Sequence, residues 1–123
     1  MPFSIKEEAD FITAYLTGVV TAGDVLGLAA AAWEIEKSRK LIPHRITDLS
    51  GVENMDVDFT VILRAAENRR SKVFPNSFKS AFIAPRDQQL GFVRMFQTLN
   101  DHPQIDIRIF RDMASAEAWI YEQ

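Results

Sequence analysis

The sequence predicts an α/β domain with a mixed sheet, in which an N-terminal antiparallel strand pair is followed by βα repeats and helices cover the sheet. Short runs rich in β-branched and aromatic residues alternate with segments whose apolar residues recur at i, i+3 and i+4. The predicted order is β-β-α-β-α-β-α-β-α, and strands joined through helices favour right-handed crossovers and parallel pairing. No linker or low-complexity tract interrupts the chain, so we expect a single domain over residues 1–123.

The N-terminal strand pair is predicted over residues 3–9 and 11–17, with Asp10 between the two runs. Apolar side chains alternate in both runs, which favours antiparallel strands around a tight turn. Gly18 is expected to end the second strand. Thr21 and Asp24 nearly match a capping box, with aspartate where glutamate is usual, and so predict the start of a helix.

The first helix is predicted from apolar spacing that includes Trp33 and Glu36, and Pro43 ends that part of the chain. The next segment reads as a strand from residue 44 that leaves into a loop at residues 48–56. The second helix is predicted to be capped by Asp58 or Asp56 and to end before Pro75, with apolar positions at Phe59, Ile62, Leu63, Ala66 and Val73.

The C-terminal part continues the repeat. Residues 78–85 are nearly continuously apolar towards their end, which fits a strand buried on both faces, and residues 87–100 have helical spacing. Isoleucines alternate in the strand that begins at residue 105. Ser115 is expected to cap a short last helix that carries Trp119.

Composition excludes several classes of function. With 47% apolar and 25% charged residues, the chain matches an ordinary globular domain, and the absence of cysteine excludes disulfide scaffolds and thiolate sites. A net charge of −3 gives no electrostatic reason to expect nucleic acid as a partner. The longest apolar run, residues 25–33, is too short to span a bilayer, and the N-terminus lacks an export pattern. We therefore expect no stable membrane insertion and a cytoplasmic location.

Catalytic residues are not apparent in the sequence. The two histidines, His44 and His102, have no carboxylate at metal-ligand spacing, and no nucleophile elbow, Walker loop or dinucleotide fingerprint is present. We predict no catalytic residue, no metal, no cofactor and no enzymatic activity.

Residues 48–56, with the sequence DLSGVENMD, precede an apolar helix FTVILRAAE, and together they resemble the signature loop of the STAS, or anti-anti-sigma-factor, superfamily. Residues 82–97 and 107–120 are similar to the last two βα units of its SpoIIAA-like, or STAS-like, bacterial branch. The resemblance covers nearly the whole chain and implies the SpoIIAA-like fold. The residues that we call the signature loop are Asp48, Ser50, Gly51, Asp56, Val57, Asp58 and Thr60.

The signature loop departs from the superfamily at the position that matters for regulation. In phosphorylated members a serine directly follows the second aspartate, whereas Val57 stands at that position in this chain and cannot accept a phosphoryl group. Glu53, Asp56 and Asp58 can satisfy the helix N–H groups themselves and would repel an added phosphate. We expect no phosphorylation cycle, and Asp58 is either an ordinary helix cap or a fixed mimic of phosphoserine.

Two further segments carry candidate binding residues. Arg64 and the run at residues 69–72 are either a small anion patch or cations that suit the C-terminal end of a helix dipole. The segment at residues 87–100 has more apolar residues than one face needs, which is typical of a protein contact or an apolar ligand site unless the sheet edge buries them. The candidate contact or ligand face is Phe92, Met95, Phe96, Leu99, Phe82 and Trp119.

Two functions are therefore predicted. The first is a non-catalytic STAS-like regulatory or scaffolding domain that acts through protein–protein contact, either with a partner or with itself as a homodimer. The second is a binding module for a small apolar molecule or lipid, since the SpoIIAA-like branch is similar in topology to the CRAL-TRIO lipid-transfer fold. The second function requires a pocket between a helix and the sheet, lined by residues such as Phe82, Phe92, Phe96 and Trp119.

Overall fold

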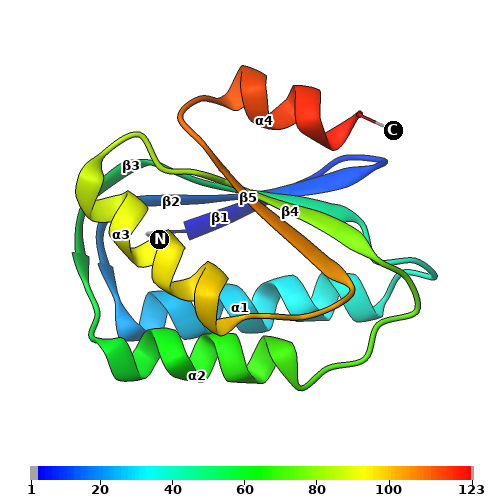
Figure 1. Ribbon diagram of the computed structural model, residues 1–123, viewed down its shortest axis with the longest axis horizontal. Coiled ribbons are helices and arrows are strands. Elements are labelled where there is room, and N and C mark those ends of the chain that lie inside the picture. The colour runs from blue at the N-terminus through cyan, green and yellow to red at the C-terminus, as the bar shows by residue number, and fades with distance from the viewer. Residues whose placement is uncertain (1–2, 123) are drawn as a thin grey trace.

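The computed structural model describes residues 3–122 and consists of one sheet with helices on both faces (Figure 1). In chain order the elements are β1 (Phe3–Glu7), β2 (Phe11–Thr21), α1 (Ala22–Lys37), β3 (His44–Asp56), α2 (Phe59–Arg70), β4 (Phe78–Ile83), α3 (Asp87–Leu99), β5 (Ile105–Phe110) and α4 (Met113–Ile120). The predicted order of strands and helices is confirmed.

The sheet has its five strands in chain order, β1-β2-β3-β4-β5. Strand β1 runs antiparallel to β2, and every following pair is parallel, so the predicted mixed sheet is confirmed. Because each parallel pair is joined by a crossover of the same hand, α1, α2 and α3 lie together on one face, while α4 lies alone on the other (Figure 1).

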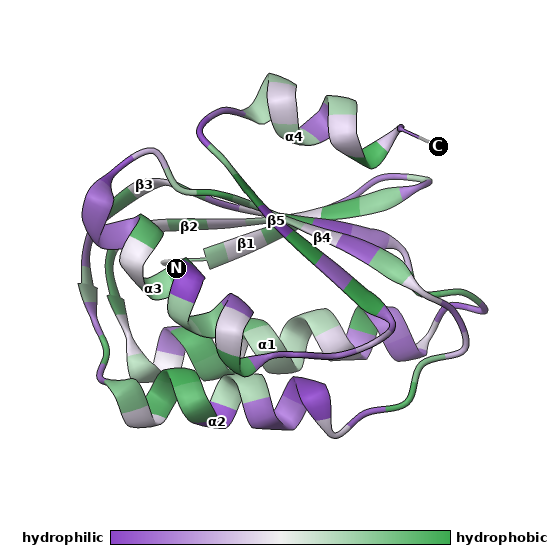
Figure 2. Cartoon of the chain, viewed as in Figure 1, coloured by the Kyte–Doolittle hydropathy of each residue, from purple (hydrophilic) through white to green (hydrophobic). Residues whose placement is uncertain are grey.

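Apolar cores form on both faces of the sheet as a result of this arrangement. On the face of α1, α2 and α3 the buried cluster includes Leu16, Leu28 and Val93, whereas Phe11 and Trp119 belong to the cluster beneath α4. Figure 2 shows that the first half of α2 is hydrophobic and its second half hydrophilic. The end of α2 that carries its basic residues therefore adds polar groups to the first face.

The loop predicted at residues 48–56 is wrong, because β3 continues to Asp56. Strand β2 also continues past Gly18 to Thr21, and the two extensions pair in parallel from Thr17 opposite Gly51 to Thr21 opposite Asp56. Gly18 does not end β2: with φ at +69° it bends the strand at a register shift, a backbone conformation that glycine adopts without strain. Pairing satisfies backbone groups that a loop would have left to water.

One apolar position predicted for the second helix, Val73, is also wrong. Helix α2 ends at Arg70, and Val73 lies beyond it with 90% of its surface exposed. Phe59 lies in the helix as predicted, at its first position, and is 53% exposed. Ile62 and Ala66, three and seven residues after Phe59, are buried as predicted.

Two of the three helix caps predicted from the sequence are confirmed. At α1 the Thr21 N–H donates to Asp24 Oδ2 at 2.8 Å and the Asp24 N–H donates to Thr21 Oγ1 at 3.4 Å, so the capping box is confirmed. Asp58, one of the two predicted candidates, caps α2. The cap of α4 is Asp112 and not Ser115, whose backbone N–H donates to the Asp112 carboxylate at 2.8 Å.

The two glycines Gly51 and Gly91 are expected to respond in opposite directions to alanine. A Cβ at Gly51 would lie 2.9 Å from Thr17 Cγ2 and 3.4 Å from the Leu16 carbonyl oxygen, so Gly51→Ala should lower the free energy of unfolding by about 1–3 kcal/mol. Gly91 is an exposed residue inside α3 with no neighbour within 4 Å of an added Cβ, and Gly91→Ala should raise that free energy by about 0.5–1 kcal/mol. Urea unfolding of both variants tests this, and shifts of the same sign would contradict it.

Candidate functional site

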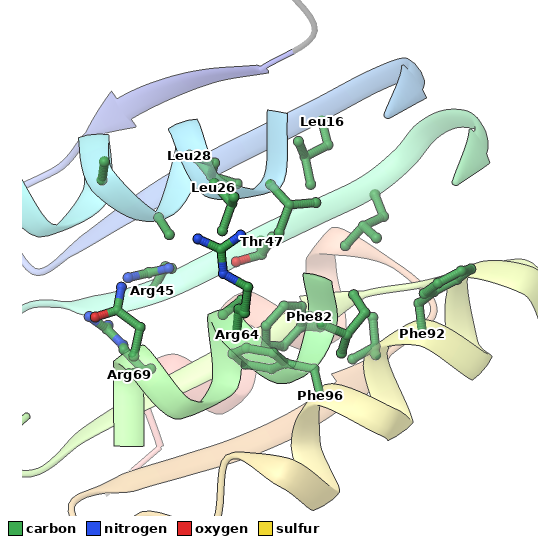
Figure 3. A pocket seen from close by; sticks show the side chains of 18 of the residues that line it. Leu16, Leu26, Leu28, Arg45, Thr47, Arg64, Arg69, Phe82, Phe92 and Phe96 are labelled. Atoms are coloured by element: carbon green, nitrogen blue, oxygen red, sulfur yellow. The ribbon is translucent and has the colours of Figure 1, made fainter. Parts of the chain in front are cut away.

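A cavity of about 470 Å³ lies beneath the sheet on the face covered by α1, α2 and α3 (Figure 3). Strands β2, β3 and β4 provide one wall, and the three helices provide the others. Ligand pockets in proteins typically have roughly 300–1,000 Å³, so the cavity is large enough for a small molecule. Its larger apolar lining residues are Leu16, Val25, Leu26, Leu28, Trp33, Leu49, Met55, Ile62, Phe82, Phe92, Val93 and Phe96.

Small side chains on α1 and α2 leave this space open. Ala29 and Ala30 line the cavity from α1, and Ala65 lines it from α2. Alanine favours the helix but does not fill the space between a helix and a sheet. The alanine-rich sequence of α1 is thus the local cause of the cavity.

Only part of the predicted candidate face surrounds the cavity. Phe82 and Phe96 line it with ring centroids 5.7 Å apart, and Phe92 lines it from the same helix as Phe96. Met95 and Leu99 are half-buried and lie outside the lining.

Trp119 lies outside the pocket as well. It packs beneath α4 on the opposite face of the sheet, against Phe110 at 5.6 Å between ring centroids. Its predicted place in a pocket with the phenylalanines is wrong, because α4 does not share their face.

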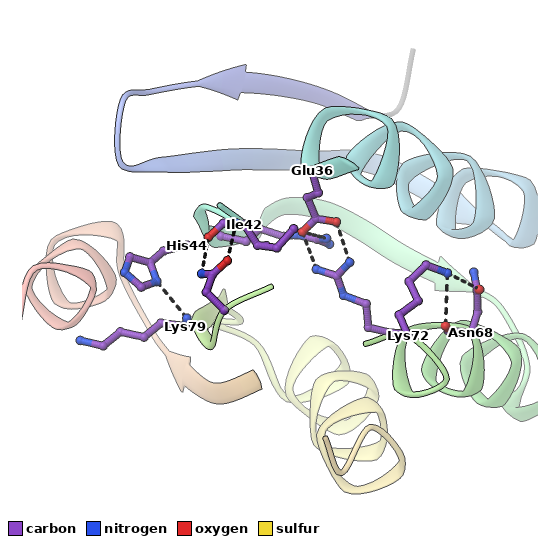
Figure 4. A network of polar contacts seen from close by, with 9 residues as sticks. Glu36, Ile42, His44, Asn68, Lys72 and Lys79 are labelled. Atoms are coloured by element: carbon purple, nitrogen blue, oxygen red, sulfur yellow. Dashed lines mark hydrogen bonds and ion pairs between the residues drawn. The ribbon is translucent and has the colours of Figure 1, made fainter. Parts of the chain in front are cut away.

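One end of the cavity is bounded by a buried ion-pair cluster. The Glu36 carboxylate accepts hydrogen bonds from both terminal nitrogens of Arg69 at 2.6 and 2.5 Å, and from Arg45 at 3.1 Å (Figure 4). Arg69 also lies 5.1 and 5.3 Å from the rings of Phe74 and Phe78. The cluster joins α1, β3 and α2, three elements far apart in the sequence.

Burial would by itself raise the pKa of Glu36, but the hydrogen bond from Arg69 and the charges of Arg45 and Arg69 outweigh it and lower the pKa of this carboxyl. Burial, together with the charge of Arg69, lowers the pKa of Arg45 to about 10 although Glu36 opposes this. Glu36 and Arg45 are therefore both charged at neutral pH.

Further polar groups line the same end of the cavity. Lys72 Nζ donates to Asn68 Oδ1 at 2.8 Å and lies 5.0 Å from the Trp33 ring centre. Arg64 lines the cavity and is exposed, which places it at the mouth. Figure 3 shows Arg45, Arg64 and Arg69 on one side of the cavity and Phe92 at the other.

Sequence reasoning singled out Arg64 and residues 69–72 but missed Glu36, Arg45 and Thr47 as members of a site. Glu36 could have been found, because it follows Trp33 at the i+3 position of an apolar helix face. A carboxylate on such a face requires cationic partners. Nothing in the sequence indicates that the partners are Arg45 and Arg69.

The signature loop does not contribute to the lining described here. Asp48 Oδ1 accepts from the Ser50 N–H at 2.9 Å, and Asp58 Oδ1 accepts from a backbone N–H in the first turn of α2 at 3.1 Å. Val57 packs, half-buried, against the core on the helix-rich face, and Thr60 is exposed. Asp58 thus acts as a helix cap, one of the two roles that its position allows.

The histidines have structural hydrogen bonds. His44 Nδ1 accepts from the Lys79 N–H at 2.9 Å (Figure 4), and burial, with the charge of Lys79, lowers the pKa of His44. His102 Nδ1 accepts from the Gln104 N–H at 3.0 Å, and its Nε2 lies 2.6 Å from the Lys72 carbonyl oxygen. Within residues 3–122, no three His, Asp or Glu side chains gather as metal ligands, and no helix there has the length and apolar character of a membrane span.

Comparison with solved structures identifies the fold. An uncharacterised DUF3478-family protein from Shewanella loihica PV-4, described as having a SpoIIAA-like fold, superimposes with a TM-score of 0.62 at 13% identity over 96% of this chain and 91% of that chain. The chain has the SpoIIAA-like fold. An anti-sigma factor antagonist from Mycobacterium paratuberculosis is similar to this SpoIIAA-like domain with a TM-score of 0.58 at 12% identity, over 98% of this chain and 93% of that one.

Sequence comparison is less informative for this SpoIIAA-like domain. Neither a protein-family model nor a curated protein sequence matches the chain. At 12–13% identity the structural similarity establishes the fold, and function has to be argued from the cavity itself.

Proposed function

We propose that this domain is a non-catalytic binding module for a small apolar molecule. The observation that carries the proposal is the 470 Å³ cavity between the sheet and the helices α1, α2 and α3. Most of its lining is aliphatic or aromatic, and a few polar groups gather at one end, which is the usual composition of small-molecule sites. Phe82, Phe92 and Phe96, predicted from sequence as an apolar ligand face, contribute three of its aromatic side chains.

Filling the cavity tests the proposal. Ala29→Phe should occupy the space with a side chain from α1, whereas Ala114→Phe is a control on the exposed surface of α4. Native mass spectrometry of the protein purified from its own cells should find a retained apolar molecule in the wild type and the control, and at least about tenfold less of it in Ala29→Phe. An empty wild-type protein, or equal occupancy in all three, would contradict the proposal.

Protein contact is the second candidate function, and exposed apolar residues beside the signature loop favour it. Val19, near the end of β2, is 52% exposed, and Phe59 at the start of α2 is 53% exposed. Thr21, two residues after Val19, pairs with Asp56, three residues before Phe59. The exposed Val19 and Phe59 therefore lie near the same end of the β2–β3 pair. Such residues suit a regulatory or scaffolding domain that docks a protein or a second copy of itself, and the anti-sigma factor antagonist shares the fold. Under this proposal Val57 keeps docking independent of phosphorylation.

A further inference from the structure

The charge at the polar end of the cavity is unbalanced. The lining contains four cationic side chains, Arg45, Arg64, Arg69 and Lys72, and no carboxylate among the described lining residues. Glu36 lies next to the lining and offers one negative charge to Arg45 and Arg69. Lys72 has neutral partners, and Arg64 has no ion-pair partner within residues 3–122. A cavity of low polarity with surplus positive charge favours an anion.

Two buried polar atoms at this end also lack a hydrogen-bond partner. Within residues 3–122 neither Arg45 Nε nor Thr47 Oγ1 is paired. Both residues line the cavity and stand two positions apart on β3, so their side chains point to the same face of the sheet. Thr47 is only 4% exposed, and water from outside does not solvate its hydroxyl. Leaving such donors unsatisfied costs free energy that a bound acceptor would recover.

The chemistry of these groups restricts the ligand further. An arginine Nε can only donate, and a hydroxyl can donate as well, so the unpaired atoms require acceptor oxygens. Two donors within a cationic surrounding match the two oxygens of a carboxylate. A phosphate would bring more charge and more oxygens than these two donors satisfy.

We infer that the ligand is an anionic amphiphile, an apolar chain that ends in a carboxylate, with the carboxylate beside Arg45, Thr47 and Arg64 and the chain among Phe82, Phe92 and Phe96. The inference rests on the proposed function, since it names the chemical class of molecule that the cavity takes. Arg64, exposed at the mouth, supplies the charge that no carboxylate of the described chain pairs. Glu36 holds Arg45 and Arg69 in place and leaves Arg45 Nε free for the ligand.

Calorimetric titration with three matched probes below their micelle concentrations tests the inference: dodecanoate, dodecanol and dodecyl phosphate. Wild-type protein should bind dodecanoate at least about tenfold more tightly than either other probe. Thr47→Val and Arg64→Gln should each weaken dodecanoate binding by about tenfold or more while dodecanol binding changes little. Arg94→Gln, on an exposed arginine of α3 outside the lining, is the control and should leave all three affinities unchanged.

The two variants are suited to this test because we expect both to fold. Thr47→Val removes a hydroxyl without a partner within residues 3–122 and keeps the shape of the side chain, and Arg64 makes no ion pair within that part of the chain. If dodecanol binds as tightly as dodecanoate, or if both variants leave dodecanoate binding intact, the inference that the ligand ends in a carboxylate is wrong. The proposal of an apolar ligand site is then unaffected. Binding of dodecyl phosphate that is tighter than that of dodecanoate would also contradict the inference of a carboxylate ligand. If no probe binds and native mass spectrometry finds an empty protein, the proposed function itself fails.

Discussion

Glu36→Gln should lower the free energy of unfolding by about 3–5 kcal/mol, because it removes the one carboxylate of a buried cluster and leaves two arginines without an opposite charge. The Glu36 side chain has no exposed surface, and those of Arg45 and Arg69 are each 13% exposed, so water cannot replace the lost partner. Urea unfolding at neutral pH measures the effect. Glu34→Gln is the matched control on the same helix, since Glu34 pairs with Lys37 on the surface, where an ion pair contributes about 0–1 kcal/mol.

The same cluster gives a dependence of stability on pH with a defined sign. The folded pKa of Glu36 lies below its ordinary value of 4.5, so the unfolded chain takes up the proton first as the pH falls. The contribution of Glu36 is therefore complete above pH 4.5 and is lost as the pH falls through the depressed folded pKa. The difference between wild type and Glu36→Gln should shrink over that window. If Glu36→Gln lowers the free energy of unfolding no more than Glu34→Gln does, the cluster does not act as described. The same holds if the difference in unfolding free energy between wild type and Glu36→Gln does not change with pH.

The fold could be predicted from sequence because its elements are encoded locally. Helix spacing, the Thr21–Asp24 box and the alternating isoleucines from Ile105 each depend on neighbours in the chain. The extension of β3 could not be predicted from sequence, because the segment DLSGVENMD contains turn-forming residues. It becomes a strand only by pairing with β2. That pairing joins Thr17 to Gly51, residues far apart in the sequence, and local propensity carries no information about it.

The candidate site was predictable in part for the same reason. Phe92 and Phe96 lie one turn apart on one helix, so their shared face follows from spacing alone. The Glu36 cluster joins residues of α1, β3 and α2, and the cavity depends on which small side chains of α1 and α2 meet across the sheet. These contacts join residues far apart in the chain, so local sequence patterns do not predict them.

Trp119 shows how the position of one helix decides the role of a residue. Helix α4 follows the last strand and leads into no further strand of the described chain, so the rule that places crossover helices on one face does not apply to it. It covers the opposite face alone, with Trp119 packed against Phe110 and the Lys79 and Arg108 side chains 5.2 and 5.0 Å from the indole. An aromatic residue near the end of the sequence could equally have faced the cavity.

Trp119→Ala should therefore lower the free energy of unfolding by about 3–5 kcal/mol and leave the ligand site intact. Trp119 is 5% exposed, and α4, eight residues long, is the helix that covers this face in the described chain. Removing the indole leaves a cavity beneath α4 that the sheet cannot collapse to fill. Urea unfolding measures the loss, with Tyr121→Ala, an exposed aromatic residue just after α4, as the control.

The binding readout of Trp119→Ala separates the two faces of the sheet. If the cavity beneath α1, α2 and α3 is the site, the folded fraction of this variant should bind dodecanoate as the wild type does, because the sheet lies between Trp119 and the cavity. Ala29→Phe should show the reverse pattern, with binding lost and stability changed less. Loss of binding in folded Trp119→Ala would place the ligand beneath α4 and would contradict the assignment of the cavity, since no residue of α4 contributes to its described lining.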